Sequence, residues 1–133
     1  METPRSWLVD DLRRRPLKDV LAAYDQVKRA QMNGATLDTM DEVVLEQAPA
    51  MAADTAQSYT DIQLSRALAD LEKARLEHGA HADPSWQVQA NALMTTATDR
   101  HPPIENTITS WESNPDYSSP LHAAADALHA LTT

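Results

Sequence analysis

Apolar residues recur at steps of three and four along most of this chain, which is the spacing of an amphipathic helix. The pattern is clearest between Thr60 and His78, where one stripe contains Leu64, Ala67, Leu68, Leu71 and Ala74. Thr60 and Gln63 have the spacing of a capping box, and Gly79 stands where a left-handed residue ends a helix. The sequence therefore predicts a well-defined helix over residues 60–78.

A second apolar stripe, on a different face of this helix, consists of Ile62, Ala69 and Leu76. A helix that is apolar on two faces packs against more than one neighbour, so we expect it at the centre of a bundle. The segments 17–32 and 86–97 carry apolar stripes of similar length and are the expected neighbours.

The first part of the chain predicts two helices before residue 35. A short helix is expected over residues 4–14, with Thr3 as its N-cap and Pro4 at its first helical position. Pro16 disfavours helical geometry at the residue before it, so the chain should break there. The second helix runs over residues 17–32 and ends at the Asn33-Gly34 turn.

A third helix is predicted from Leu37 to Ala48, with Thr39 and Glu42 at the spacing of a capping box. Pro49 follows directly. It either stops this helix or begins a short alanine-rich helix that reaches Gln57.

Capping residues and prolines at their first positions predict where two of the remaining helices begin. Asp83 is expected to cap a helix that has Pro84 at its first position, and Ser119 is expected to cap another that begins at Pro120. Between them, Ile104, Ile108 and Trp111 share one face of a shorter helix. No segment shows the alternation of a strand.

These elements predict an all-α fold. We expect a single domain over residues 1–133, a helical bundle of about six or seven helices, several of them short. Residues 1–15 form a short N-terminal helix or arm.

Composition limits the core of this bundle. The 133 residues include twenty-two Ala, twenty-three Leu, Ile or Val, and no Phe. Alanine helices approach closely, but each buries little apolar area, at about 25 cal/mol per Å². Such a monomer gains modest stability, so a homodimer or another homo-oligomer is expected.

The chain contains no Cys, which removes disulfides and sulfur-ligated zinc and fits a reducing compartment. It shows no apolar stretch of signal-peptide length at its start and none long enough to span a bilayer. A cytoplasmic protein without a membrane partner is therefore expected.

The charge is uneven. Residues 1–30 carry seven Lys or Arg against five Asp or Glu, whereas residues 31–133 carry four against fifteen, within a total of −9. An acidic body opposes nucleic-acid binding, except through the basic N-terminal segment, because phosphate neutralisation supplies most of that affinity. It suits attraction to a basic partner, or serves only to keep the surface solvated.

Catalytic and metal-binding patterns are weak. His122 and His129 flank Asp126 on one helical face, but seven residues separate them by roughly 10 Å, too far for shared chelation. The set of Glu77, His78 and His81 lies at a helix end, where the helix dipole favours histidine without any function. Two glycines leave no phosphate-binding loop. No metal, cofactor or catalytic residue is predicted.

The function expected from these observations is a non-enzymatic protein-interaction module, an inhibitor or adaptor that binds the basic surface of a nucleic-acid-handling partner. The acidic contact residues are Asp38, Asp41, Glu42, Glu46, Asp70 and Glu77. The exposed aromatic anchor is Trp7, beside a basic patch of Arg13, Arg14 and Arg15, which alternatively pairs with the acidic body of the same chain.

Two other functions remain open. One is a helical enzyme with a divalent-metal site built from carboxylates such as Glu42, Glu46 and Glu77, or from the histidine face at residues 122–129. The other is a structural subunit of a larger assembly.

Overall fold

The computed structural model describes residues 4–132, and seven α-helices make up most of this range. They are α1 (Arg5–Arg13), α2 (Leu17–Met32), α3 (Thr39–Ser58), α4 (Asp61–His78), α5 (Pro84–Arg100), α6 (Ile104–Thr109) and α7 (Pro120–Thr132). Two 3₁₀ turns, η1 (Ala80–Ala82) and η2 (Trp111–Ser113), follow α4 and α6. No strand occurs between residues 4 and 132, so the predicted all-α bundle of six or seven helices is confirmed.

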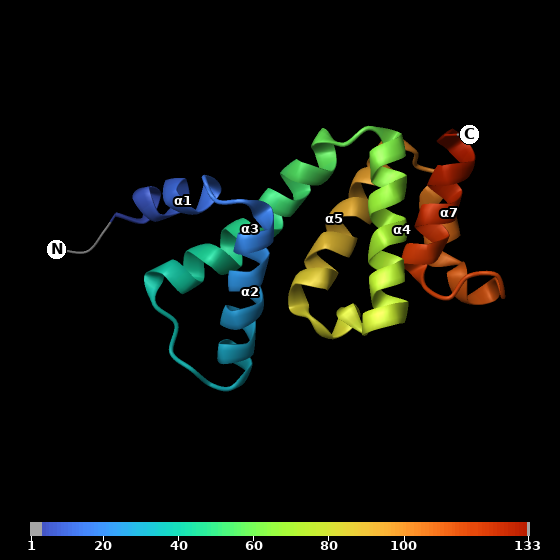
Figure 1. Ribbon diagram of the computed structural model, residues 1–133. Helices are drawn as coiled ribbons and strands as arrows, with labels where there is room; N and C mark the ends of the chain where they lie inside the picture. The colour runs from blue at the N-terminus through green and yellow to red at the C-terminus, as the bar shows by residue number, and fades with distance from the viewer. Residues whose placement is uncertain (1–3, 133) are drawn as a thin grey trace.

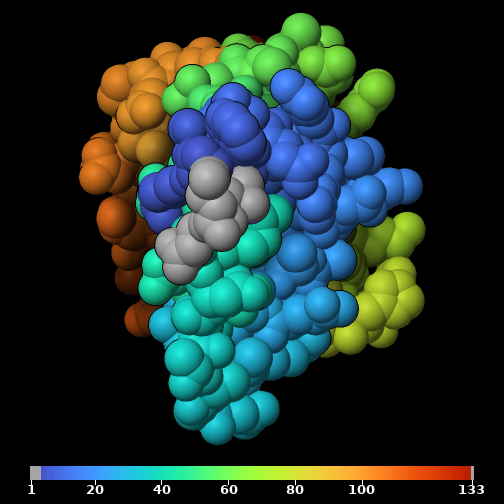
Figure 2. All heavy atoms as spheres, turned by 90° about the vertical axis from the view of Figure 1, so that its left-hand side faces the viewer, coloured from blue at the N-terminus to red at the C-terminus, as the bar shows by residue number. Residues whose placement is uncertain are grey.

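Figure 1 shows α4 upright between α5 and α7, with α1 and α2 at the opposite end of the molecule. The long helix α3 runs obliquely from the end that holds α1 and α2 toward the top of α5. In the view of Figure 2, α1 lies against the first half of α3, and α2 lies beside it. Among the helices of residues 4–132, none combines the length and apolar character needed to cross a membrane.

The buried side chains form two clusters. The first cluster joins α1, α2 and the first half of α3, through Leu12, Val20, Tyr24, Val27, Val43, Val44 and Ala48. The second cluster joins the end of α3 to α4, α5, α6 and α7, and its largest members are Leu64, Leu68, Trp86, Leu93, Ile104, Leu121 and Leu128. Helix α3 therefore belongs to both clusters.

The ends of α4 are as predicted. The Gln63 amide N–H donates to Thr60 Oγ1 at 3.2 Å, and the Thr60 N–H donates to Gln63 Oε1 at 2.9 Å, which completes the capping box. Gly79 adopts φ 63°, ψ 28°, the left-handed conformation that glycine reaches at little cost.

The predicted second apolar face of α4 is not buried. Ile62 is 52% exposed and Leu76 is 62% exposed. Helix α7 instead approaches α4 beside this stripe, where Ser65 and Glu72 are buried. Helix α2 was also wrongly predicted as a neighbour of α4, since it packs mainly against α3 and α5. Leu64 and Leu68 of the first stripe belong to the second cluster. The hydroxyls of Ser118 and Ser119, just before α7, donate hydrogen bonds to Glu72 and so hold the start of α7 against α4.

Helix α3 differs from the prediction in two respects, its N-terminal capping box and the effect of Pro49. Its capping box uses Asp38 and Asp41 rather than Thr39 and Glu42, with Asp41 N–H donating to Asp38 Oδ1 at 2.8 Å. Pro49 neither stops nor starts a helix but lies inside it. Proline in a helix interior costs about 3 kcal/mol, and the flanking residues Ala48 and Ala52 hold this part of the helix in buried contacts.

The start of α5 is capped from another helix. Asp83 takes the N-cap position, but its side chain makes no capping hydrogen bond and pairs with Arg29 instead. Asp25 of α2 accepts hydrogen bonds at 2.7 Å from both the N–H and the hydroxyl of Ser85. The predicted N-cap position and the start at Pro84 are therefore confirmed, but a carboxylate distant in sequence, and not Asp83, accepts the capping hydrogen bonds.

The shorter elements follow the sequence closely. Helix α1 begins after Pro4, which is its N-cap, and the predicted cap Thr3 lies outside the described residues. The chain leaves helical geometry at Arg15, as Pro16 predicts. Trp111 was predicted to share one face of α6 with Ile104 and Ile108, but it lies beyond the end of that helix, in η2.

Candidate functional site

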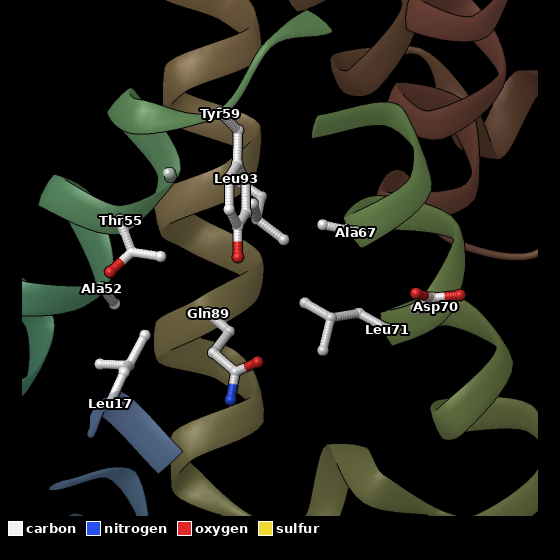
Figure 3. Close-up of a pocket in the computed structure, with 10 residues that line it drawn as sticks. Leu17, Ala52, Thr55, Tyr59, Ala67, Asp70, Leu71, Gln89 and Leu93 are labelled. Atoms are coloured by element: carbon white, nitrogen blue, oxygen red, sulfur yellow. The ribbon is translucent and has the colours of Figure 1, made fainter. Parts of the chain in front are cut away.

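The junction of α3, α4 and α5 encloses a central pocket of about 260 Å³ (Figure 3). Its apolar lining consists of Leu17 from the start of α2, Ala52 and Ala56 from α3, Ala67 and Leu71 from α4, and Leu93 from α5. Alanine on facing helices leaves this space open, because a methyl group reaches only a short way from the backbone.

Four polar side chains also line the central pocket, namely Thr55, Tyr59, Asp70 and Gln89. Figure 3 shows the Tyr59 ring in front of α5, with its hydroxyl on the side of Gln89. The Thr55 hydroxyl donates to the Met51 carbonyl at 2.9 Å. The Tyr59 hydroxyl and the Gln89 amide make no hydrogen bond to another residue within 4–132.

A second hollow, the acidic groove, lies between α5 and α6 and measures about 340 Å³. Met94 and Ile108, both partly buried, contribute its apolar surface. Asp99 and Glu105 supply two carboxylates, and neither forms an ion pair with another residue in the described part of the chain. The other lining residues are Asn91, Thr95, Thr98 and Thr109.

The most buried carboxylate belongs to Glu72 on α4, which is 6% exposed. Ser119 Oγ donates to it at 2.6 Å, Ser118 Oγ at 2.9 Å and Arg75 Nη2 at 2.6 Å. Burial raises the pKa of Glu72, but the hydrogen bonds from Arg75, Ser119 and Ser118 and the charge of Arg75 together lower it below its ordinary value. Ser119 also accepts from the His122 N–H at 3.1 Å, so this network caps α7 and ties it to α4.

A second network of polar side chains joins the start of α4 to the end of α5. Asp61 lies 2.9 Å from His101 Nε2 and accepts from Arg100 Nη1 at 3.1 Å. These hydrogen bonds, first that of His101 and then that of Arg100, lower the pKa of Asp61. In both polar networks the carboxylate, Glu72 or Asp61, receives its hydrogen bonds from side chains of the same chain, which indicates a structural role.

The carboxylates predicted on α3 are mostly engaged by the chain itself. Asp38 and Asp41 form the capping box, and Glu46 pairs with Arg5. Glu42 is exposed. Asp70 and Glu77 lie on α4, which packs against α5 and α7, so the structure does not bring them together with the α3 set.

The predicted basic segment also forms pairs within the chain. Arg13 donates to Gln47 at 2.8 Å and to Asp54 at 3.3 Å, and Arg15 donates to Asp11 at 2.7 Å. Arg14 is exposed and Trp7 is 65% exposed, as expected of an aromatic side chain near the chain end. The basic patch is therefore largely neutralised by α3 and by α1 itself.

The histidine sets do not converge on a common point. His122 Nδ1 accepts from the Ser118 N–H at 3.2 Å, whereas Asp126 accepts from the Tyr117 hydroxyl at 2.8 Å. Within residues 4–132, no three His, Asp or Glu side chains are placed to hold a metal ion together. The metal-enzyme alternative thus has no ligand set in this part of the chain.

Comparison with known proteins brings no further assignment. No protein-family model, curated protein or solved structure matches the chain.

Among the polar residues that line the two hollows, Asp70 was a predicted site residue, whereas Tyr59, Gln89, Asp99 and Glu105 were not. Tyr59 lies in the short break between α3 and α4, and Gln89 on α5 carries no pattern beyond its helical position. Asp99 and Glu105 did carry a signal, because they flank the His101-Pro102-Pro103 break and no Lys or Arg follows Arg100. A break between two helices brings their ends close together, so two carboxylates on either side of it face a shared space.

Proposed function

We propose that the protein is a non-enzymatic interaction module that binds the basic surface of another protein, such as one that handles nucleic acid. The observation that carries this proposal is the acidic groove between α5 and α6. It combines two unpaired carboxylates with an apolar surface, which suits the long, cation-tipped side chains of Lys and Arg.

The charge around the groove supports an external cation. Residues 101–133 contain no Lys or Arg. The nearest cation in sequence, Arg100, donates to Asp61 at 3.1 Å and to the Gln57 carbonyl at 2.8 Å. Asp99 and Glu105 are therefore left to attract a positive charge from outside, which raises the rate of encounter and fixes orientation.

The apolar part of the groove supports the same kind of partner. Lys and Arg lay their aliphatic stems along apolar surface and keep the charged head near water or a carboxylate. Met94 and Ile108 offer such a surface between the helices. A basic side chain would thus contact both features at once, whereas a phosphate would meet only repulsion.

The α3 carboxylates make a weaker contact surface than the sequence indicates. Arg5 already pairs with Glu46, and the capping box occupies Asp38 and Asp41. Glu42, Asp70 and Glu77 contribute to the overall negative field. The proposal therefore places the main contact on α5 and α6.

A fluorescent peptide of alternating Arg and Ala tests this proposal on the full chain. We expect binding that weakens as salt rises from about 50 mM, because screening shortens the range of the field. Asp99→Asn with Glu105→Gln should weaken binding by roughly tenfold, if each exposed pair contributes up to about 1 kcal/mol. Anisotropy titrations measure both effects.

The matched control is Asp10→Asn with Asp19→Asn, which removes the same two charges from α1 and α2. Both residues are exposed. The control should change binding less than twofold. Equal weakening by the two double variants would show that only net charge matters, and absence of binding at low salt would refute the proposal.

A further inference from the structure

We propose that the central pocket between α3, α4 and α5 binds a small uncharged aromatic molecule that carries a hydroxyl group, that is, a phenol. No residue of the acidic groove lines this pocket, so the two sites are independent.

The size and walls of the pocket fit one substituted ring. The pocket has a volume of about 260 Å³, is partly open to solvent, and is bounded by Ala67 and Leu71 on α4 and by Leu93 on α5. A closed apolar cavity of about 150 Å³ already admits benzene. The central pocket therefore has room for a ring with one or two substituents.

The unpaired polar groups favour a ligand with a hydrogen-bonding group of its own. The Tyr59 hydroxyl and the Gln89 amide both lie in the pocket and both donate and accept hydrogen bonds. Neither has a hydrogen-bond partner within residues 4–132. A phenolic hydroxyl matches such groups because it also donates and accepts.

The charges around the pocket favour an uncharged molecule. Asp70 is the carboxylate of the lining, and no Lys or Arg lines the pocket, so an anion would meet repulsion without compensation. Arg66 and Lys73 stand about one turn to either side of Asp70 on α4. Their positive charges offset the attraction that Asp70 would exert on a cation.

The ring of Tyr59 favours an aromatic ligand over an aliphatic one. Aromatic rings attract one another in offset or edge-to-face arrangements at centroid distances of about 4.5–7 Å. Tyr59 is one of the lining residues, and Figure 3 shows its ring in front of α5, on the side of the pocket where Leu93 lies. A bound ring can therefore contact it as well as the leucine walls.

Three probes of similar size test the ligand class: p-cresol, toluene and p-toluate. Isothermal titration with the full chain, checked by protein-observed NMR, should rank p-cresol first. Toluene should bind threefold to tenfold more weakly, the effect of one neutral hydrogen bond. No binding of p-toluate is expected. Equal binding of p-toluate and p-cresol, or no binding of p-cresol up to its solubility, would overturn the proposal.

Four variants locate the site. Tyr59→Phe keeps the ring and should reduce the preference for p-cresol over toluene to less than twofold. Ala67→Leu and Gln89→Phe fill the pocket from different helices and should each weaken p-cresol binding at least tenfold, with far-UV circular dichroism confirming that the chain stays folded. Asp99→Asn, in the acidic groove, should leave p-cresol binding unchanged. Unaltered binding in both filled variants would place p-cresol elsewhere and refute the assignment.

Discussion

Three carboxylates each accept two or more hydrogen bonds from a segment distant in the sequence. Glu72 links α4 to the start of α7, Asp25 links α2 to the start of α5, and Asp61 links α4 to the end of α5. Each accepts at least two hydrogen bonds, and those to Glu72 and Asp61 lower the pKa of these two carboxyl groups. At the residue scale, the fold therefore depends on charged side chains as well as on apolar packing.

Glu72→Gln tests the best-satisfied of these carboxylates. A glutamine cannot accept from both serines and Arg75, so the free energy of unfolding at pH 7 should fall by about 1–3 kcal/mol. The folded-state pKa of Glu72 lies below its ordinary value, so its contribution is present above about pH 4.3 and is lost as the pH falls toward the lowered pKa. Urea unfolding at pH 7 and at about pH 3.5 should show a smaller loss at the lower pH.

Glu77→Gln, on the exposed side of the same helix, is the control for this measurement. It should change stability by no more than about 0.5 kcal/mol at either pH. An equal loss for Glu72→Gln at both pH values would contradict the lowered pKa.

Asp25→Ala and Asp83→Ala separate the tertiary cap of α5 from the local one. Asp25→Ala removes both hydrogen bonds to Ser85 and should cost about 1–2 kcal/mol, the range of a lost N-cap. Asp83→Ala removes only an exposed pair with Arg29 and should cost less than about 1 kcal/mol. Urea unfolding of both variants makes the comparison, and the reverse order would assign the cap to Asp83.

At the scale of elements, α3 shows how packing overrides a local signal. The helix continues through Pro49, although proline lacks the N–H that would bond to the carbonyl four residues earlier. Ala48, Ala52 and Ala56 on one face are buried in or beside the two clusters. Alanine-rich flanks with high helix propensity and buried contacts on both sides keep the segment helical.

Pro49→Ala should therefore stabilise the protein. Alanine restores the missing N–H at an exposed position and should raise the free energy of unfolding by about 1–3 kcal/mol. Thermal unfolding by circular dichroism measures the change. Ala50→Pro is the opposite control and should destabilise by a similar amount, whereas a lowered stability of Pro49→Ala would show that α3 needs the proline.

At the scale of the whole molecule, two hydrophobic clusters share two helices. Helix α3 contributes side chains to both clusters, and Val88 of α5 packs against the first cluster while Trp86 belongs to the second. Because neither cluster is complete without these helices, the clusters should unfold together as one domain.

Leu12→Ala tests this coupling from the first cluster, and Leu68→Ala tests it from the second. Both side chains are fully buried, so each substitution should cost about 2–5 kcal/mol. Each should shift the tryptophan fluorescence and the far-UV circular dichroism transitions equally. A Leu12→Ala variant that loses part of its helix signal before the fluorescence changes would instead reveal two separately folding units.

The candidate sites were predictable only in part. The sequence indicated acidic carboxylates on helices and named Asp70, which does line the central pocket. It could not indicate that Arg5 lies against Glu46, because such pairs depend on how α1 and α3 cross. Nor could it identify Tyr59 and Gln89 as neighbours, since thirty positions along the chain separate them.

By itself, the sequence determined the helices and most of their ends, because periodicity, capping residues and proline act over a few residues. The segment 60–78 shows this, since its capping box and Gly79 hold as predicted. Only the tertiary structure decided which faces are buried, which carboxylates cap distant helices and where hollows remain. Those outcomes depend on the packing of segments far apart in sequence, and the exposed stripe of Ile62 and Leu76 shows that apolar periodicity alone does not guarantee a neighbour.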